Sequence, residues 1–360
     1  MSGKKKYTLQ DIARELNTSI STVSRALKDH PRISAEMCEK VQKFALEHNY
    51  QPDFRASSLR MGSNRTIGVL VPRIDINFFA RVLRGIDEIC SMDNYNVMIC
   101  QSFDSLQKEM KLVNSLLNGK IDGLIASISI ETQDGDHFNS LIDKGLPLVF
   151  FDRVLHSLNV HKVVIDDYKG AYESVEHLIR NGYKRIAHFA GPQHHNIYSQ
   201  RKLGYLEALK NNGFEIDEEI IFHNTIVQET GYKAMQKIRE MKNPPDAIFS
   251  SSDYAILGAI VYAKKHGIEI PKQLGLTGFA NEPFDDLYAP SITSVDQHPI
   301  MMGQKAARLL IDAMEKKNKA TEPQILKLDP TLIVRQSSSR LKLIGNLTDE
   351  ETEIILKKAF

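Results

Sequence analysis

The 360-residue sequence has no tryptophan and few cysteines, which are Cys38, Cys90 and Cys100. An odd number of cysteines without metal-ligand spacing indicates small buried side chains in a reducing compartment, so no disulfide is expected. No run approaches the roughly eighteen apolar residues of a membrane span. The basic start Lys4–Lys6 has no apolar stretch behind it, so no secretory signal is expected. We therefore expect a cytoplasmic protein without a membrane segment.

Sequence motifs of common enzyme classes are also missing. There is no Gly-Lys-Ser/Thr phosphate loop, no Gly-x-Ser-x-Gly turn and no Gly-x-Gly-x-x-Gly fingerprint. His188, His194 and His195 have no cysteine or carboxylate partner at the usual ligand spacing, so no metal site is expected. We predict no catalytic residue and no cofactor. A carbohydrate enzyme that uses Asp152 is an alternative, but no second carboxylate accompanies it.

Charge is distributed unevenly along the chain. The formal net charge is +1, but residues 1–65 carry +5 and the remainder carries −4. A basic end on an acidic body indicates that only the N-terminal part meets a polyanion.

Residues 1–50 have the pattern of three short helices. Each predicted helix follows a hydroxyl residue that can cap its start, namely Thr8, Ser19 and Ser34. Apolar residues recur behind each cap at the spacing of one buried helix face. Asn17–Thr18 is the expected turn between the first two helices. This spacing is typical of a helix-turn-helix, whose second helix enters the DNA major groove.

The outer face of the second predicted helix carries Ile20, Ser21 and Arg25. Arg25 is suited to a bidentate contact with guanine, and Ile20 to contact with a thymine methyl group. Thr22 and Ser24 can reach phosphates. The alternative is a three-helix bundle with a solvated basic face.

A second short element follows the headpiece. Pro52 ends the third helix, and Asp53 can cap a hinge helix that reaches Arg60. This helix is too short to be stable alone, so it needs a partner helix and a surface such as DNA. Leu59 could then act as a wedge in the minor groove, or alternatively pack on the body. The polar stretch 61–64 is the expected boundary.

From Arg65 onwards, short apolar runs alternate with helical patterns. The first series of expected strands lies at 67–71, 97–100, 122–126 and 148–151, and the second series at 163–165, 186–191, 220–222, 247–249 and 276–279. Near-continuous apolar strands between helices indicate parallel sheets covered on both faces. Two series predict two similar lobes, with a ligand cleft between them at the carboxyl ends of the strands.

Several motifs occur together in an order that is highly specific. They are Thr-Leu-x-Asp-Ile-Ala at 8–13, Ser-Thr-Val-Ser-Arg at 21–25, Tyr-x-Pro at 50–52, Ala-x-Ser-Leu at 56–59, Ile-Gly-Val-Leu-Val-Pro at 67–72, Asp-Gly-Leu-Ile at 122–125, Phe-Asp-Arg at 151–153, Gly-Tyr-x-x-Ala at 204–208, a variant of Asp-x-x-Ala-x-Gly that reads Asp-Tyr-Ala-Ile-Leu-Gly at 253–258, and Pro-Ser-Ile-Thr-Ser-Val at 290–295. Through them the chain resembles the lactose/galactose-repressor family of bacterial transcription regulators over residues 7–338. The resemblance implies an α/β protein with an all-α headpiece and two doubly wound parallel-sheet lobes of the periplasmic-binding-protein type. It also implies a homodimer with one effector cleft per subunit.

The resemblance places base contacts at Ile20, Ser21 and Arg25 and the minor-groove wedge at Leu59. The full predicted DNA-binding set is Thr8, Ile20, Ser21, Thr22, Ser24, Arg25, Arg55, Ser58, Leu59 and Arg60. The hinge departs from the family pattern, because Phe54 and Arg55 replace small or apolar residues and Ser57 replaces a common arginine. Either Arg55 makes a compensating phosphate contact or the hinges pair differently.

The resemblance also supplies the predicted effector-binding set, which is Phe78, Phe79, Asp152, Arg153, His195, Arg201, Ser252, Asp253, Asn281 and Gln297. One of the two phenylalanines could instead pack in the core, and Asp253 could instead cap its helix. Ala280 stands where the family has an aspartate that holds sugar hydroxyls. Because Arg153, Arg201 and His195 remain, we expect an anionic effector such as a sugar acid or sugar phosphate.

Four segments are predicted: a headpiece at 1–51, a hinge and linker at 52–64, a two-lobed effector-binding and dimerisation domain at 65–338, and a C-terminal extension with a possible helix at 339–360. The predicted function is a ligand-responsive repressor that binds a near-palindromic DNA operator as a homodimer and senses a sugar, sugar acid or sugar phosphate. Assembly beyond a dimer is left open. The alternatives are a solute-binding protein and a DNA-binding regulator without a working effector site.

Overall fold

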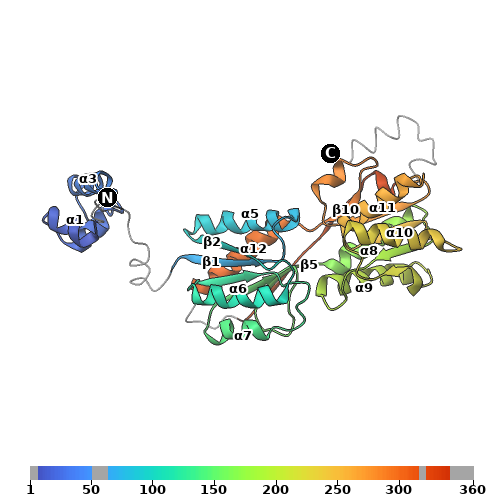
Figure 1. The fold of residues 1–360 in the computed structure, drawn as a ribbon, viewed down its shortest axis with the longest axis horizontal. Coiled ribbons are helices and arrows are strands. Elements are labelled where there is room, and N and C mark those ends of the chain that lie inside the picture. Colours follow the sequence, from blue (N-terminus) through green and yellow to red (C-terminus); the bar gives the residue numbers. More distant parts are fainter. Residues whose placement is uncertain (1–6, 51–63, 316–321, 341–360) are drawn as a thin grey trace, which may run out of the picture. The chain divides into compact units, whose positions relative to one another are not determined.

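The computed structural model describes residues 7–50, 64–315 and 322–340. The chain divides into two compact units, Met1–Asn64 and Arg65–Phe360. The elements carry the labels of Figure 1. The predicted hinge helix and nearly all of the predicted C-terminal extension lie outside the described residues.

The first unit contains the three predicted helices, α1 (Leu9–Glu15), α2 (Ile20–Ala26) and α3 (Ala35–Glu47). The predicted caps are confirmed, because the hydroxyl groups of Thr8, Ser19 and Ser34 accept hydrogen bonds from the backbone N–H groups of Asp11, Thr22 and Met37. The turn at Asn17 uses a left-handed backbone, with φ of 49°. The buried faces of the three helices meet in one small core around Ile12, Val23 and Val41.

The N-terminal lobe of the second unit is a six-stranded sheet in the order β11-β5-β4-β3-β1-β2. All its described strand pairs are parallel. Its strands are β1 (Thr66–Val71), β2 (Asn96–Gln101), β3 (Gly123–Ala126), β4 (Leu148–Phe151), β5 (His161–Ile165) and β11 (Ile325–Leu328). Its helices are α5 (Asn77–Met92), α6 (Leu106–Asn118), α7 (Asp136–Asp143) and α12 (Pro299–Glu315).

The C-terminal lobe is a second six-stranded sheet in the order β12-β10-β9-β8-β6-β7, in which β12 alone is antiparallel to its neighbour. Its strands are β6 (Ile186–Phe189), β7 (Ile221–Phe222), β8 (Ala247–Ser250), β9 (Gly275–Phe279), β10 (Thr293–Asp296) and β12 (Thr331–Ile333). Its helices are α8 (Asp167–Arg180), α9 (Asn196–Asn211), α10 (Gln228–Glu240) and α11 (Asp253–Lys265). Short 3-10 turns lie at η1 (Glu218–Ile220), η2 (Pro283–Asp286) and η3 (Gln336–Ser338).

The two sheets do not follow the chain in two consecutive halves. The strand expected to open the second series, at 163–165, is β5, and it pairs with β4 and β11 in the first sheet. The chain crosses between the lobes three times, after β5, after β10 and after β11. The assignment of this strand to the second lobe was therefore wrong, because an apolar run shows that a strand is buried but not which sheet contains it.

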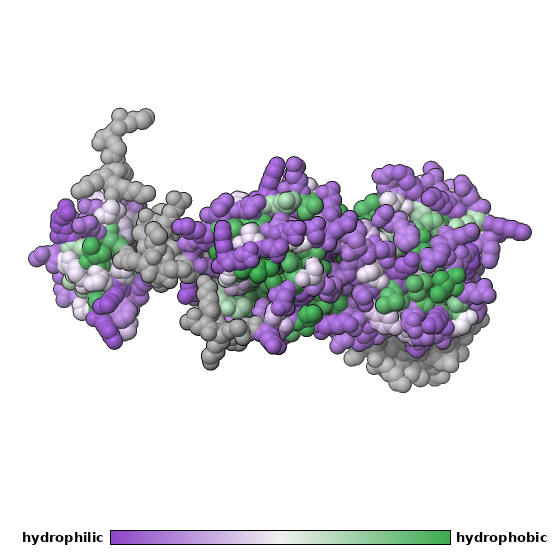
Figure 2. All heavy atoms as spheres, turned by 90° about the horizontal axis from the view of Figure 1, so that it is seen from below, coloured by the Kyte–Doolittle hydropathy of each residue, from purple (hydrophilic) through white to green (hydrophobic). Residues whose placement is uncertain are grey.

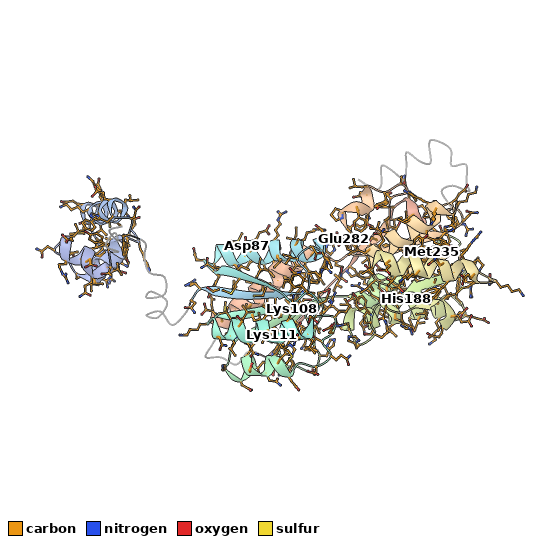
Figure 3. All side chains as sticks on the ribbon, viewed as in Figure 1. Asp87, Lys108, Lys111, His188, Met235 and Glu282 are labelled. Atoms are coloured by element: carbon orange, nitrogen blue, oxygen red, sulfur yellow. The ribbon has the colours of Figure 1, made fainter. Side chains whose placement is uncertain are left out.

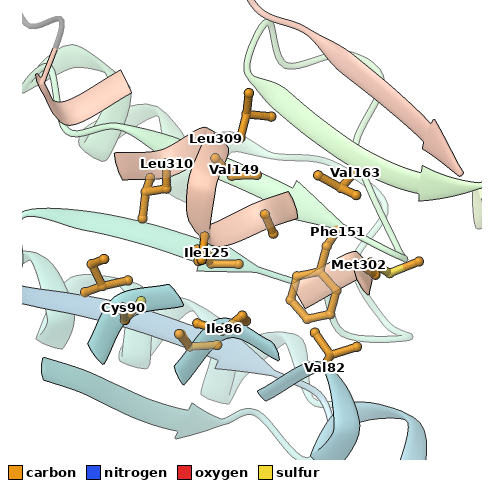
Figure 4. Close-up of a cluster of buried hydrophobic side chains, with 14 of the residues drawn as sticks. Val82, Ile86, Cys90, Ile125, Val149, Phe151, Val163, Met302, Leu309 and Leu310 are labelled. Atoms are coloured by element: carbon orange, nitrogen blue, oxygen red, sulfur yellow. The ribbon is translucent and has the colours of Figure 1, made fainter. Parts of the chain in front are cut away.

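Each sheet is covered on both faces. In the N-terminal lobe, α5 and α12 pack on one face, where Val82, Phe151 and Met302 belong to one apolar cluster (Figure 4). A separate cluster under α6 and α7 covers the other face. Gly85 and Gly303 allow α5 and α12 to touch, because a Cβ atom at either position would lie 2.1 Å from a carbonyl oxygen of the opposite helix. Within the described residues, no helix combines the length and apolar character that a membrane span requires.

Candidate DNA-binding surface and effector site

Helix α2 exposes the side chains that were predicted to contact bases. Val23 and Ala26 are fully buried, whereas Ile20 is 39% exposed and Ser21 and Arg25 also lie on the exposed face. The spacing of 3.6 residues per turn produces this division, since the buried residues occupy one side of a two-turn helix. The exposed side therefore combines a branched apolar side chain, a hydroxyl group and a guanidinium group.

Hydroxyl groups fix the start of this helix and the start of α1. The Ser19 hydroxyl lies 2.8 Å from the hydroxyls of Ser21 and Thr22 and accepts a bond from the Thr22 N–H at 3.1 Å. Thr8 forms a capping box with Asp11, in which the Thr8 N–H donates to the carboxylate at 2.9 Å. Ser24 is half-buried.

Four residues of the predicted DNA-binding set, Arg55, Ser58, Leu59 and Arg60, lie outside the described residues. Their roles remain predictions.

In the second unit, Arg153 follows the carboxyl end of β4 and is 94% buried, with 6% of its surface exposed. Its Nη1 donates to Asp104 at 2.6 Å, and its guanidinium carbon lies 6.0 Å from the ring centre of Phe79. Its Nε is buried without a hydrogen-bond partner among the described residues. The neighbouring Asp152 is also buried, and burial raises the pKa of its carboxyl group while Arg153 and Arg201 lower it.

Arg201 on α9 is the second buried arginine of this region. It donates from Nε to Asp167 and from Nη1 to the carbonyl oxygen of Ser251, both at 2.8 Å. Its guanidinium carbon lies 3.6 Å from the ring centre of Phe279. Burial raises the pKa of Asp167 to about 7, although Arg201 opposes this shift. Both predicted effector-binding arginines therefore already have carboxylate partners.

His195 was predicted as one of three cationic groups, but the structure does not support a charged imidazole there. The side chain is 1% exposed, and its Nε2 donates to the Ile130 carbonyl oxygen at 2.8 Å. Burial lowers the pKa of His195 to about 4, so the ring is neutral at physiological pH. His194 donates to the same oxygen at 2.9 Å. Together with the two paired arginines, this neutral ring removes the argument for an anionic effector.

Phe78 and Phe79 both lie in the first turn of α5. They are 6% and 2% exposed, their ring centres are 5.1 Å apart, and both belong to the core cluster of the N-terminal lobe. Phe79 also packs edge-to-face against Phe151 at 6.3 Å. Core packing, which was considered for one of them, applies to both in this structure. Their contact with an effector remains a prediction.

The remaining predicted effector-binding residues lie in the C-terminal lobe. Ser252 is the N-cap of α11 but makes no side-chain capping bond, and Asp253 does not cap the helix either. Asp253 instead accepts from the Ser294 hydroxyl at 2.8 Å and from the Glu282 N–H at 3.3 Å. The Asn281 side chain is held between Asp296 and Arg335, each at 2.8 Å. Gln297 follows β10 and is 4% exposed.

Sequence reasoning missed several polar groups at the same edges of the two sheets. Asn196 joins the lobes, because its side chain accepts from the Val154 N–H and donates to the Asp152 carbonyl oxygen, both at 3.0 Å. The hydroxyl groups of three buried serines at strand ends have no hydrogen-bond partner among the described residues, and these are Ser102, Ser127 and Ser251. Their position within two residues of the end of a predicted strand was the only available signal.

A helix-turn-helix unit followed by two such lobes defines the class of DNA-binding proteins that carry a two-lobed ligand-binding body. The family model for bacterial regulatory proteins of the lacI family matches residues 8–53, and the model for a periplasmic binding protein-like domain matches residues 175–338. The NTD biosynthesis operon regulator NtdR of Bacillus subtilis (strain 168) is 32% identical over 92% of this chain and 99% of its own length. The transcriptional repressor CytR of Escherichia coli (strain K12) is 30% identical over 93% of this chain and 97% of its own length. The chain belongs to the lacI family of bacterial regulatory proteins.

Solved structures agree with this assignment. The transcriptional regulator CelR in complex with cellobiose has a TM-score of 0.71 and 27% identity, covering 92% of this chain and all of its own. The lac repressor dimer bound to operator and an anti-inducer has a TM-score of 0.80 at 21% identity, covering 93% of this chain and 99% of its own. The fold predicted from the sequence is confirmed.

Proposed function

We propose that this protein is a transcriptional repressor that binds a near-palindromic operator as a homodimer and responds to a neutral sugar held between its two lobes. It acts in the cytoplasm as a regulator rather than an enzyme. The observation that carries the proposal is the combination of an exposed face on α2 with buried polar atoms at the strand ends of the body that have no partner among residues 7–50, 64–315 and 322–340.

The DNA-binding part of the proposal rests on Arg25. Its guanidinium group extends from the exposed face of α2, where it can donate to guanine O6 and N7. Replacing Arg25 with alanine is expected to weaken operator binding by about 1–3 kcal/mol and to relax the base preference at one operator position. Selection of binding sites from random DNA measures this preference. An unchanged preference would mean that Arg25 contacts phosphate instead of a base.

The effector part of the proposal rests on two properties of the buried polar groups between the lobes: their charges are compensated, but some of their hydrogen-bonding atoms are not used. Arg153 and Arg201 are paired with Asp104 and Asp167, and His195 is neutral, so an incoming anion would meet no uncompensated cation among these groups. Arg153 Nε and the hydroxyls of Ser102, Ser127 and Ser251 have no hydrogen-bond partner within the described part of the chain. Sugar hydroxyls can both donate to and accept from such groups, which would remove the free-energy cost of burying them unpaired. The cellobiose complex of the relative CelR is consistent with this chemistry.

A thermal-shift titration tests the effector class. The purified full-length protein is screened against D-ribose, D-glucose, cellobiose, gluconate and glucose 6-phosphate. A ligand at 100 times its dissociation constant adds about 2.7 kcal/mol to the stability of the folded state. We expect stabilisation by a neutral sugar that is lost in the Arg153→Ala variant. Stabilisation by the two anions alone would contradict the neutral-sugar proposal.

The homodimer part is supported by exposed apolar side chains on an edge strand. Strand β2 ends the sheet of the N-terminal lobe, and Met98 and Ile99 on it are 44% and 50% exposed. Figure 2 shows hydrophobic patches among the hydrophilic side chains of the body. An unpaired edge strand with apolar side chains is a surface suited to a partner chain. Analytical sedimentation of the wild-type protein should show a dimer. The Ile99→Asp variant should dissociate into monomers more readily than the wild type.

A further inference from the structure

The two buried arginines of the predicted effector site differ in the hydrogen-bonding capacity that they keep for a ligand. In Arg201, each nitrogen has a partner, because Nε and Nη2 contact Asp167 and Nη1 donates to the Ser251 carbonyl oxygen, all at 2.8 Å. Arg153 donates from Nη1 to Asp104 at 2.6 Å, whereas its Nε has no partner among the described residues. Of the two arginines, Arg153 is therefore the one with a nitrogen left for a ligand.

Asp104, the partner of Arg153, lies in a strained turn between β2 and α6. The Ser105 N–H closes this turn by donating to the Ser102 carbonyl oxygen at 3.2 Å. Phe103 and Asp104 both have a left-handed backbone, with φ values of 56° and 59°. Such a backbone is costly for residues other than glycine, and burial of Phe103 does not offset the cost, since this residue is 58% exposed. The contacts of the Asp104 carboxylate therefore help to hold the turn.

One carboxylate oxygen of Asp104 serves two partners at the junction of the lobes. Oδ1 accepts from Arg153 Nη1 and, at 3.0 Å, from the Ile130 N–H. The Ile130 carbonyl oxygen in turn accepts from the two histidines of the C-terminal lobe described above. Figure 3 shows Lys108, in the first turn of α6, at the end of its lobe nearest the other lobe, and its ammonium lies 4.0 Å from the ring centre of Phe103. The fold thus fixes Asp104 beside Arg153.

The charge of Asp104 matters because water screens this region poorly. Arg153 is almost fully buried, so a carboxylate at ion-pair distance decides the local net charge. His195 is neutral, and burial raises the pKa of the adjacent Asp152. An uncharged ligand can accept a hydrogen bond from Arg153 Nε without disturbing the ion pair. An anion would bring a second negative charge close to Asp104, which costs free energy.

We propose that Asp104 is a specificity-determining residue that acts through Arg153. Its carboxylate compensates the charge of the arginine, so the site selects uncharged ligands, and loss of this one charge would convert the site to one that binds anions. The bond to the Ile130 N–H keeps the carboxylate in place. The identity of the uncharged ligand as a sugar rests on the proposed function, whereas the exclusion of anions does not.

Isothermal titration of the full-length protein tests the proposal. The probes are inorganic phosphate and two matched pairs, D-glucose with D-glucuronate and D-galactose with D-galacturonate, in which a carboxylate replaces a hydroxymethyl group on the same ring. Asp104→Asn keeps an acceptor oxygen for Arg153 and Ile130 but removes the negative charge. We expect this variant to bind phosphate or a uronate at least about tenfold more tightly than the wild type does.

Two further variants and one control separate the charge from the structure of the turn. Asp104→Ala should also gain anion binding, but it should exchange the Ile130 amide hydrogen faster, whereas Asp104→Asn should stay within about twofold of the wild type. The double variant Asp104→Asn/Arg153→Ala should lose the gain. Asp93→Asn removes the same charge from an aspartate–arginine pair with Arg308, 2.9 Å long, at the C-terminal end of α5 and should leave anion binding unchanged.

Each outcome of the titrations decides between the two proposals. Equal anion binding in the wild type and both variants of Asp104 would overturn the role of Asp104, and so would a gain that persists without Arg153. Anion binding gained by the variants, with no neutral sugar bound by the wild type, would reject the sugar effector and leave the role of Asp104 standing. Binding of a neutral sugar with no gain of anion binding in the variants would reject the role of Asp104 alone.

Discussion

The two lobes share a sheet architecture but bury their acidic residues in opposite ways. In the N-terminal lobe, Glu109 is fully buried and accepts from the Ser129 N–H at 2.5 Å, the Thr132 hydroxyl at 2.7 Å and His137 Nε2 at 2.9 Å. In the C-terminal lobe, the fully buried Asp253 and Asp285 lie close enough for their charges to interact. One lobe surrounds its acid with donors, and the other places two acids together.

The pair of buried acids in the C-terminal lobe has to bind a proton. Burial and the negative charge of the nearby Asp253 raise the pKa of Asp285 to about 10. Two adjacent buried carboxylates cannot both ionise at neutral pH, so Asp285 keeps a proton there. In the N-terminal lobe, Glu109 holds the loop that contains Ser129 and Thr132. The carbonyl oxygen of Ile130 in this loop accepts hydrogen bonds from His194 and His195 of the other lobe. In the C-terminal lobe, Asp253 holds the segment after β9, because it accepts a hydrogen bond from the Glu282 N–H.

The largest expected effect on stability comes from removing the carboxylate of Glu109, which is surrounded by hydrogen-bond donors. Glu109→Ala should lower the free energy of unfolding by about 3–5 kcal/mol, because it leaves three buried polar groups without their acceptor. Glu109→Gln, which keeps one acceptor oxygen, should cost clearly less. Chemical denaturation of both variants measures the difference. Equal losses would mean that side-chain volume rather than the acceptor stabilises this loop.

The Asp285→Asn variant is expected to be more stable than the wild type, by a smaller amount than Glu109→Ala is less stable. The folded state binds a proton at Asp285 that the unfolded chain, with a pKa near 3.8, releases. The wild-type protein therefore loses stability as the pH rises from about 4 towards 10. An asparagine is neutral without binding a proton, so we expect a gain on the order of 2 kcal/mol at pH 8 that shrinks at pH 5. Denaturation at the two pH values tests it, and a pH-independent difference would contradict the shared proton.

The smallest expected effect concerns the contact between the lobes. Asn196→Ala removes two hydrogen bonds that cross the junction and none within the sheets. Stability should fall by about 1–2 kcal/mol, while the hydrogen-exchange protection of the two sheets should stay unchanged. A loss of protection inside either sheet would show that Asn196 supports that lobe instead of joining the two.

Local sequence determined the parts of the protein that depend on neighbouring residues. The hydroxyl caps and apolar spacing gave the three headpiece helices, because a helix start needs an acceptor within three residues. Short apolar runs located most of the strands, and the positive first 65 residues indicated which part meets DNA. Arg25 could be placed on the exposed face of α2 from helical periodicity alone.

Only the tertiary structure decided which distant residues meet. It assigned β5 to the first sheet, paired Arg153 with Asp104 and Arg201 with Asp167, and buried His195 so that its ring is neutral. Strand order, ion pairing and a pKa depend on groups far apart in the chain and on the exclusion of water, and neither of these is written in local sequence spacing.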